Sequence, residues 1–346
     1  MRMDFAERTL PRAYAHLLHF YRQSEQKLGR VEQFYTIAGY TVCLRFAGEA
    51  LAPKLTSALA HLSTTPTAAP DLVVCLADQQ SSGVAMPRLA WGPGMYSSAQ
   101  ARLYFYLNEQ GHWQESFMPR FRLALLAIAD SALYPPYAQA APLRNILVWW
   151  LAQHGLYGLH VAAVGDAEGV VLIVGSGGAG KSTTAIACLQ AGFSYLGDDF
   201  CVLGFDPAPR IHSLYSSGKL CDDSRHWLNP YEAAASEVSD NGKMIYQWHS
   251  QFKAQLPSSL PIRAILLPRL SGATSTTVHA ASPGEAFTAL TTTTLRVMSL
   301  PTKSISNLLG AISRLTRQVP CYHVALGGEL AQLPGVISAI LEQHRP

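Results

Sequence analysis

The sequence predicts an α/β protein of two domains, with a glycine-rich loop between a strand and a helix in the C-terminal one. Three observations support this fold class. The 346 residues exceed one small core and fit two domains of roughly 100 to 200 residues each. Apolar strand-like and helix-like segments alternate along most of the chain. An apolar run, 170–174, leads directly into the glycine-rich loop.

The composition is that of a well-buried globular protein, with 49% hydrophobic and 14% charged residues. The net charge is +3 without a long basic run, so no nucleic-acid partner is expected. The six scattered cysteines predict reduced core residues rather than disulfides or a structural metal. No stretch has the ~18 uninterrupted apolar residues of a membrane span, and the first residues lack a signal-peptide pattern. We expect no membrane association and a cytoplasmic location.

The pattern of residues 1–137 predicts a smaller N-terminal α/β domain. Its loop 63–70 is rich in Ser, Thr and Pro, and apolar residues recur at helical spacing before it and at strand-like spacing on both sides. No motif in this domain indicates a chemistry, so its role is open. The expected elements are helices over 4–29 and 53–62 and strands over 41–46 and 71–77.

A second domain, 138–346, is expected to begin after the adjacent prolines Pro135 and Pro136 and an alanine-rich stretch. The apolar run 170–174 is typical of a strand buried on both faces of a sheet. The remaining expected elements are helices over 143–153, 183–191 and about 330–343, and strands over 195–196, 264–267 and 322–326.

The loop 175–182 reads Gly-Ser-Gly-Gly-Ala-Gly-Lys-Ser and matches G-x-x-x-x-G-K-[ST] completely, between an expected strand and an expected helix. Its glycines allow backbone N–H groups to turn around an anion at a helix N-terminus, where the dipole also favours phosphate. Lys181 would reach the β- and γ-phosphates and Ser182 would offer its hydroxyl to Mg²⁺. A merely tight turn would not need this Lys-Ser pair. The predicted site for Mg²⁺ and ATP, or another nucleoside triphosphate, comprises Gly175, Ser176, Gly177, Gly178, Ala179, Gly180, Lys181, Ser182 and Thr183.

Two adjacent carboxylates, Asp198 and Asp199, follow the next short apolar segment. Such a pair suits Mg²⁺ chemistry, because one carboxylate can hold the metal while the other takes a proton from an attacking hydroxyl. Their like charges push the two pKa values apart unless a cation relieves the repulsion. An acidic turn is the alternative, and the preceding phosphate loop makes it the less favoured one.

His160 lies in an apolar alternating stretch and, taken alone, is typical of a core or edge residue. Its joint spacing with the loop and the Asp pair, however, resembles the catalytic domain of HPr kinase/phosphorylase, related in fold to phosphoenolpyruvate carboxykinase. The resemblance covers roughly 155–205. It implies a P-loop core of that type and an ATP- and Mg²⁺-dependent kinase. It also implies Asp198 as general base, Ser182 and Asp199 as metal ligands and His160 beside the transferring phosphate, although the sequence does not order the two aspartates.

Phosphoryl transfer depends on charge neutralisation, so a further cation is expected near the site. The candidates are Lys219, Lys243, Arg263 and Arg269, any of which could instead be an ordinary surface or strand-end charge; we assign Lys219 to the catalytic set.

The second signature of HPr kinases, rich in Glu, Arg and Gly ahead of an Asn, is missing, and different residues occupy 212–220. This argues against HPr as the substrate and against phosphorylase activity. The chain is more similar to HPr-kinase-related proteins of bacterial peptide-modification gene sets, among them lasso-peptide kinases that phosphorylate a serine hydroxyl.

Two functions stay open: a kinase acting on a hydroxyl, and a regulatory protein that uses triphosphate occupancy as a switch. The Asp pair favours the kinase, because a switch needs only a positioned water. The favoured acceptor is a serine of a peptide or protein, and a small metabolite is the second choice. The N-terminal domain could recognise a leader or carrier, or support a homo-oligomer.

Overall fold

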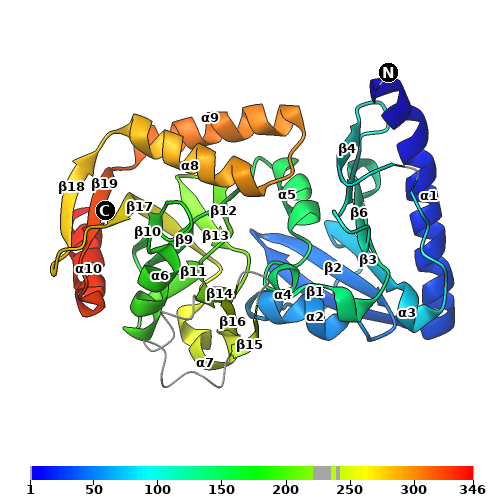
Figure 1. The fold of residues 1–346 in the computed structure, drawn as a ribbon, viewed down its shortest axis with the longest axis horizontal. Coiled ribbons are helices and arrows are strands. Elements are labelled where there is room, and N and C mark those ends of the chain that lie inside the picture. Colours follow the sequence, from blue (N-terminus) through cyan, green and yellow to red (C-terminus); the bar gives the residue numbers. More distant parts are fainter. Residues whose placement is uncertain (1, 90, 221–234, 239–241, 346) are drawn as a thin grey trace. The chain divides into compact units, whose positions relative to one another are not determined.

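A computed structural model of the chain describes residues 2–89, 91–220, 235–238 and 242–345 (Figure 1). The chain divides into two compact units. The first contains Met1–His154 and Ser299–Pro301, and the second contains Gly155–Met298 and Thr302–Pro346.

The first unit is built on a seven-stranded mixed sheet with the order β1-β2-β3-β7-β6-β5-β4. The pairs β2–β3 and β3–β7 are parallel, and the other pairs are antiparallel. The strands are β1 (Arg30–Ile37), β2 (Tyr40–Ala47), β3 (Leu72–Asp78), β4 (Gly94–Ser98), β5 (Leu103–Leu107), β6 (Trp113–Met118) and β7 (Leu123–Ile128). The helices are α1 (Arg2–Leu28), α2 (Ala52–Thr56), α3 (Gln79–Ser82), α4 (Pro136–Gln139) and α5 (Arg144–Ala152), with a 3₁₀ turn at Ser57–Leu62.

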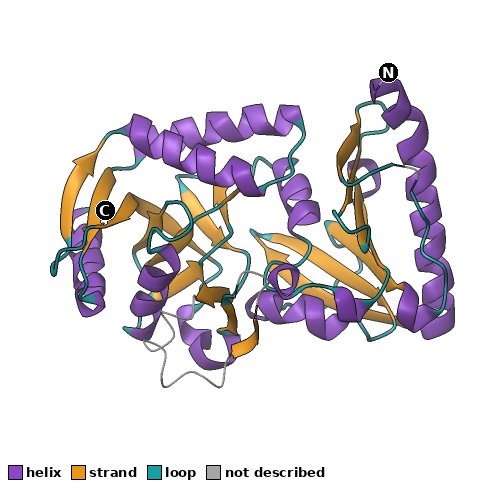
Figure 2. Cartoon of the chain, viewed as in Figure 1, coloured by secondary structure: helices purple, strands orange, loops and turns teal. Residues whose placement is uncertain are grey.

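The long helix α1 lies along this sheet, as Figure 2 shows, and buries one apolar stripe against it. Leu10, Leu17 and Phe20 recur at helical spacing and are almost fully buried. The helix predicted over 4–29 and the strands predicted over 41–46 and 71–77 are therefore confirmed. The region predicted as a helix over 53–62 divides into α2 and the 3₁₀ turn.

The compact units divide between His154 and Gly155 rather than at the prolines of the expected boundary after residue 137. Helix α5 belongs to the first unit because Trp149 is held there. Its indole packs against Tyr104 of β5, with ring centroids 5.8 Å apart, and its Nε1 donates to the Ser299 carbonyl at 2.8 Å. The adjacent prolines begin the short helix α4 instead of a linker.

The second unit is built on a nine-stranded sheet whose main path is β11-β9-β10-β17-β13-β12-β8, with β19 beside β17 and β18 beside β19. Strand β17 runs parallel to both β10 and β19. The strands are β8 (Tyr157–Leu159), β9 (Ala162–Asp166), β10 (Gly169–Ile173), β11 (Ser194–Gly197), β12 (Cys201–Gly204), β13 (Arg210–Ser213), β17 (Ser259–Leu270), β18 (Thr277–Ala281) and β19 (Cys321–Leu326). A small separate sheet contains β14 (Ser217–Leu220), β16 (Met244–Gln247) and β15 (Ala235–Val238).

The helices of this unit are α6 (Lys181–Gln190), α7 (His249–Phe252), α8 (Pro283–Val297), α9 (Thr302–Gln318) and α10 (Leu333–Gln343). Helices α6 and α10 share a core with the central strands, whereas α8 and α9 lie side by side elsewhere on the sheet (Figure 2). Every residue of β10 is buried, as its continuous apolar run predicts. The predicted strand over 322–326 and the helices over 183–191 and 330–343 are confirmed, and 264–267 is part of the longer β17.

The predicted fold class, an α/β P-loop core with a smaller N-terminal α/β unit, is confirmed. Helix α8 was not predicted, because its threonine run 291–294 has low helix propensity. Within the described ranges, no helix is long and apolar enough to cross a membrane. The described cysteines are buried and free, as predicted, and Cys221 lies outside the described residues.

Candidate active site

The glycine-rich loop joins the carboxyl end of β10 to the start of α6. Gly178 and Gly180 have φ values of +82° and +93°, a left-handed conformation that favours glycine. A Cβ added to Gly180 would also lie 2.5 Å from Leu326 Cδ1. The Ala179 N–H donates to the Ser176 carbonyl at 3.2 Å, which closes the turn before the helix. The loop therefore has the strand-loop-helix form expected of a phosphate cradle.

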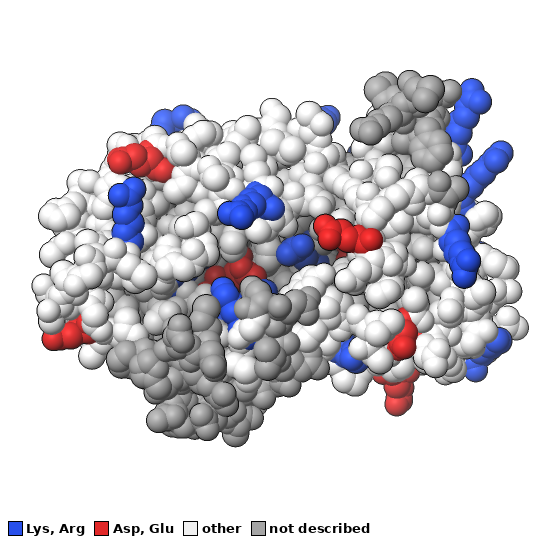
Figure 3. All heavy atoms as spheres, viewed as in Figure 1, with Lys and Arg blue, Asp and Glu red and all other residues white. Residues whose placement is uncertain are grey.

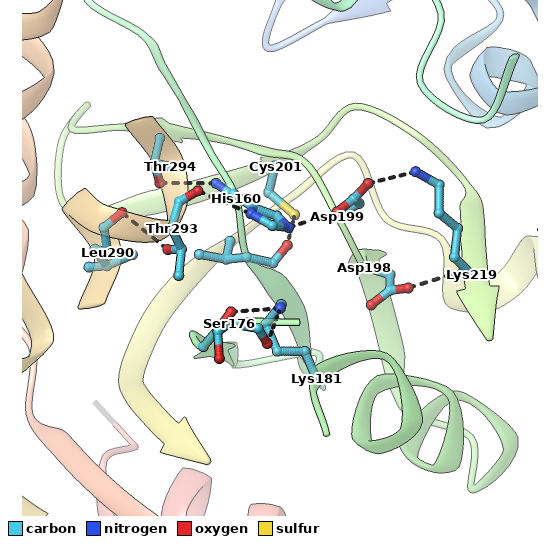
Figure 4. Close-up of polar contacts among 12 residues, drawn as sticks. His160, Ser176, Lys181, Asp198, Asp199, Cys201, Lys219, Leu290, Thr293 and Thr294 are labelled. Atoms are coloured by element: carbon cyan, nitrogen blue, oxygen red, sulfur yellow. Dashed lines mark hydrogen bonds and ion pairs between the residues drawn. The ribbon is translucent and has the colours of Figure 1, made fainter. Parts of the chain in front are cut away.

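Lys181 is the first residue of α6 and folds back over this loop. Its Nζ donates to the Gly175 carbonyl at 2.7 Å and to the Ser176 carbonyl at 3.2 Å (Figure 4). Burial lowers the pKa of Lys181, and the charges of Asp198 and Asp199 oppose that shift. Both carboxylates thus lie within electrostatic range of the ammonium group, which brings the two sequence motifs into one site.

Asp198 follows the last residue of β11 and is 3% exposed. Its Oδ2 accepts the backbone N–H of Lys219 at 3.1 Å, while its buried Oδ1 accepts no hydrogen bond from any described residue. Burial and the neighbouring Asp199 charge raise the pKa of Asp198, and the Ser182 hydroxyl and Lys181 act in the opposite direction. The site therefore contains one buried carboxylate with an open oxygen, close to the loop serine.

Asp199 has the opposite environment. Its Oδ2 pairs with Lys219 Nζ and its Oδ1 with His160 Nε2, both at 2.8 Å (Figure 4). Burial by itself would raise the pKa of Asp199, but the Lys219 ammonium and His160 outweigh it and hold this pKa well below its usual range. Asp199 is therefore an ionised carboxylate whose two oxygens are already engaged.

His160 lies between β8 and β9 and connects Asp199 to helix α8. Its Nδ1 is 3.2 Å from the Thr293 carbonyl, and its backbone N–H donates to Thr294 Oγ1 at 3.2 Å. Its ring also stacks on Phe200, with centroids 5.7 Å apart. Each ring nitrogen of His160 thus faces an acceptor, the Thr293 carbonyl at Nδ1 and the Asp199 carboxylate at Nε2. His160 thus orients Asp199 from a position that α8 fixes.

Two cavities border the loop. One, of about 380 Å³, is lined by loop residues with Ser182, Thr183, Lys181, Lys219 and Lys243. The other, of about 1140 Å³, shares 176–178 with the first and extends toward β17, β19 and α8. The first cavity offers ammonium groups and hydroxyls, which are the groups that bind phosphate oxygens and Mg²⁺.

The structure brings together five of the residues predicted from the sequence: His160, Lys181, Asp198, Asp199 and Lys219. Among the other candidate cations, Lys243 lines the smaller cavity and Arg269 the larger one. Arg263 lies outside the site, since its guanidinium donates to the Glu168 carbonyl at the opposite end of β10 from the loop. On the face seen in Figure 3, Lys and Arg side chains are dispersed rather than gathered.

Sequence reasoning missed Thr293 and Thr294, which hold His160. They lie 133 and 134 residues further along the chain, so no local pattern connects them to it. The threonine run on which they stand was visible, but nothing in it indicated a contact with a histidine.

No family model matches the chain, and no curated protein matches it in sequence. Among solved structures, the chain is similar to the Hpr(Ser) kinase/phosphatase from Coxiella burnetii, at 13% sequence identity and a TM-score of 0.30. The match covers 54% of this chain and 89% of that one. At this TM-score the similarity does not carry that enzyme's activity over to the present chain.

Proposed function

We propose that this chain is an ATP- and Mg²⁺-dependent kinase that transfers the γ-phosphoryl group to a hydroxyl. The favoured acceptor is a serine of a peptide or protein, including a ribosomally made peptide such as a lasso peptide. The observation that carries the proposal is the buried Asp198, whose open Oδ1 lies in the same site as Lys181 and Ser182 of the loop. A homo-oligomer and a cytoplasmic location stay predictions from the sequence.

Asp198 is the proposed general base. Its raised pKa makes it a stronger proton acceptor than an ordinary aspartate, and its open oxygen can receive a hydrogen bond from an acceptor hydroxyl. Asp199 is poorly suited to this step, because both of its oxygens have partners and its pKa is held low. The two carboxylates thereby divide into a proton acceptor and a fixed negative charge.

Charge neutralisation is the second requirement of phosphoryl transfer. Lys181 can exchange its loop carbonyls for the β- and γ-phosphates, and Lys219 and Lys243 line the same cavity. The two adjacent carboxylates and the Ser182 hydroxyl are oxygen ligands of the kind that Mg²⁺ takes. Ser182 and Asp199 are the proposed ligands of Mg²⁺: Asp199 would exchange its contact with Lys219 for the cation, and Asp198 would keep its open oxygen for the acceptor hydroxyl. Mg²⁺ bound there would neutralise charge on the phosphate oxygens.

The larger cavity is the proposed acceptor site. Its volume of about 1140 Å³ is above the ~300 to 1,000 Å³ typical of small-molecule pockets, which favours a peptide segment over a metabolite. It lies next to His160, because Thr293 lines the cavity and its carbonyl contacts the His160 ring. A serine entering here would meet the loop at 175–179, whereas Thr183 lines only the smaller of these two cavities.

The experiment is incubation of the full chain with γ-labelled ATP, Mg²⁺ and serine peptides encoded beside its gene, analysed for labelled peptide. Asp198→Asn should abolish labelling and still bind ATP, whereas the exposed-carboxylate control Glu168→Gln should label normally. If the parent chain binds ATP but labels none of the tested acceptors, and Asp198→Asn binds ATP with the same affinity as the parent, the nucleotide switch is favoured instead.

A further inference from the structure

The first unit contains a pocket that has no part in the proposed phosphoryl transfer. It measures about 230 Å³ and is lined by β5, β6, the turn between them, α4 and the start of α5. Glu109 and Tyr137 at its edge are exposed, whereas Trp113, Glu115 and Asn145 are buried. The pocket therefore opens to solvent above a buried floor.

Glu115 is the unusual residue of this floor. It is 3% exposed and lies on the central strand of an antiparallel triplet, opposite Tyr106 of β5 and Leu126 of β7. Its Oε2 accepts no hydrogen bond from any described residue. Burial raises its pKa to about 7, while Asn145 and Arg144 act against this shift. A carboxylate buried in this way is costly unless a partner satisfies it.

The walls around Glu115 are aromatic. Tyr106, Trp113, Tyr134 and Tyr137 all line the pocket, and the Trp113 and Tyr134 rings meet edge to face with centroids 5.4 Å apart. Ring faces attract cations, and a carboxylate beneath them adds direct charge pairing.

The charged residues of the pocket also favour a cation over an anion. Two carboxylates, Glu109 and Glu115, and one guanidinium, Arg144, line it. An anion would place a further negative charge beside the two carboxylates, whereas a cation would satisfy the open Glu115 oxygen.

We propose that this pocket binds an organic cation, an ammonium or guanidinium group, which contacts the Glu115 carboxylate and lies against the tyrosine rings. The cation could be a free amine or a basic side chain of a peptide. The site would give the first unit a recognition function that does not depend on the nucleotide site.

The test is calorimetric titration of the full chain with butylammonium at pH 8, without nucleotide. We expect saturable binding that Glu115→Gln weakens at least about 10-fold, the loss typical of a charged hydrogen bond. Tyr137→Ala, a change at the exposed edge, should weaken it by about 2- to 5-fold through the lost cation–π contact. Glu168→Gln, an exposed carboxylate of the second unit, is the matched control and should bind like the parent.

The pH profile gives a second readout that a purely structural role would not produce. Affinity should be highest above pH 7 and should fall as Glu115 takes up its proton, and the Gln variant should show a flat profile. The other titratable and charged groups facing the pocket are Glu109, Arg144, Tyr106, Tyr134 and Tyr137.

Parallel titrations with butyrate and with an end-blocked lysine peptide complete the experiment. Tighter binding of the lysine peptide than of butylammonium would identify a peptide side chain as the ligand, and the reverse order a free amine. Equal butylammonium affinity in Glu115→Gln, tighter binding of butyrate, or no saturable butylammonium binding would overturn the proposal. Because no ATP is present, none of these results bears on the kinase assignment.

Discussion

At the scale of single residues, the main feature is that two adjacent aspartates have opposite electrostatic environments. Asp198 is buried with one open oxygen and a raised pKa, and Asp199 is clamped between Lys219 and His160 with a lowered pKa. Like charges at adjacent positions ordinarily push pKa values apart, and the contacts of Lys219 and His160 with Asp199 decide which pKa falls.

Asp198→Asn should reduce phosphoryl transfer by about 10²- to 10⁴-fold, the usual contribution of a general base, and should leave ATP affinity nearly unchanged. Transfer should also be lost as pH falls through the Asp198 pKa, because the base must be unprotonated, and the midpoint should lie above the ordinary aspartate value of 3.8.

Asp199→Asn should instead raise the Mg²⁺ concentration needed for half-maximal rate. The reverse pattern in steady-state kinetics would exchange the two roles.

Lys181→Ala should weaken ATP binding by about 10- to 100-fold, since a charged hydrogen bond to phosphate contributes about 1.5 to 3 kcal/mol. AMP affinity should change little, because Lys181 is expected to contact the β- and γ-phosphates. The measurement is calorimetric titration, with Lys303→Ala on the exposed side of α9 as control. Unchanged ATP affinity in Lys181→Ala would contradict the role of the loop.

The burial of Glu115 also predicts how the stability of the protein depends on pH. Its folded-state pKa of about 7 exceeds the ordinary 4.5, so the protonated form is the one that folding favours. Its contribution is complete below pH 4.5 and is lost as pH rises through 7, by about 3 kcal/mol from the size of the shift. Denaturant unfolding at pH 5 and pH 8 should show that Glu115→Gln suppresses this loss. The same loss of unfolding free energy between pH 5 and pH 8 in the variant and the parent would contradict this contribution of Glu115.

At the scale of elements, the phosphate loop is shaped by β19 as well as by its own glycines. Leu326 of β19 occupies the space beside Gly180, where a side chain would clash. Helix α8 acts similarly on His160, since Thr293 and Thr294 provide acceptors for its ring and its backbone. Both elements come late in the chain, so the geometry of the site depends on contacts between distant residues.

Gly180→Ala should destabilise the loop and weaken ATP binding, because the left-handed φ and the Leu326 contact both oppose a side chain. Gly177 offers a matched control for the stability of the same loop, since a Cβ there meets nothing within 4 Å and its φ is not in the left-handed region. Thermal unfolding of the two alanine variants should therefore differ clearly. Equal behaviour of the pair would show that the loop adopts another conformation.

At the scale of the whole molecule, each unit carries a candidate site of its own. The proposed nucleotide site belongs to the second unit, and the aromatic pocket with Glu115 belongs to the first. Ligands that bind only the native state stabilise the unit that holds them.

Saturating ATP with Mg²⁺, at 100 times its dissociation constant, should stabilise the native state by about 2.7 kcal/mol and raise the unfolding temperature. Hydrogen exchange should localise the protection to 175–184 and around 198–199 and leave 106–115 unchanged. Butylammonium should protect 106–115 and 134–145 instead. Protection of both regions by either ligand would contradict two separate sites.

The sequence by itself determined the phosphate loop and the Asp pair, together with the buried β10 strand and the helix that follows the loop. These features are contiguous patterns in which neighbouring residues and their periodicity carry the information. Only the tertiary structure decided that Lys219 and His160 contact Asp199 and that α8 holds His160. It also placed Arg263 away from the site and buried Glu115 in a pocket lined by tyrosines. These outcomes depend on burial and on contacts between distant residues, which the folded sheet sets and no local pattern records.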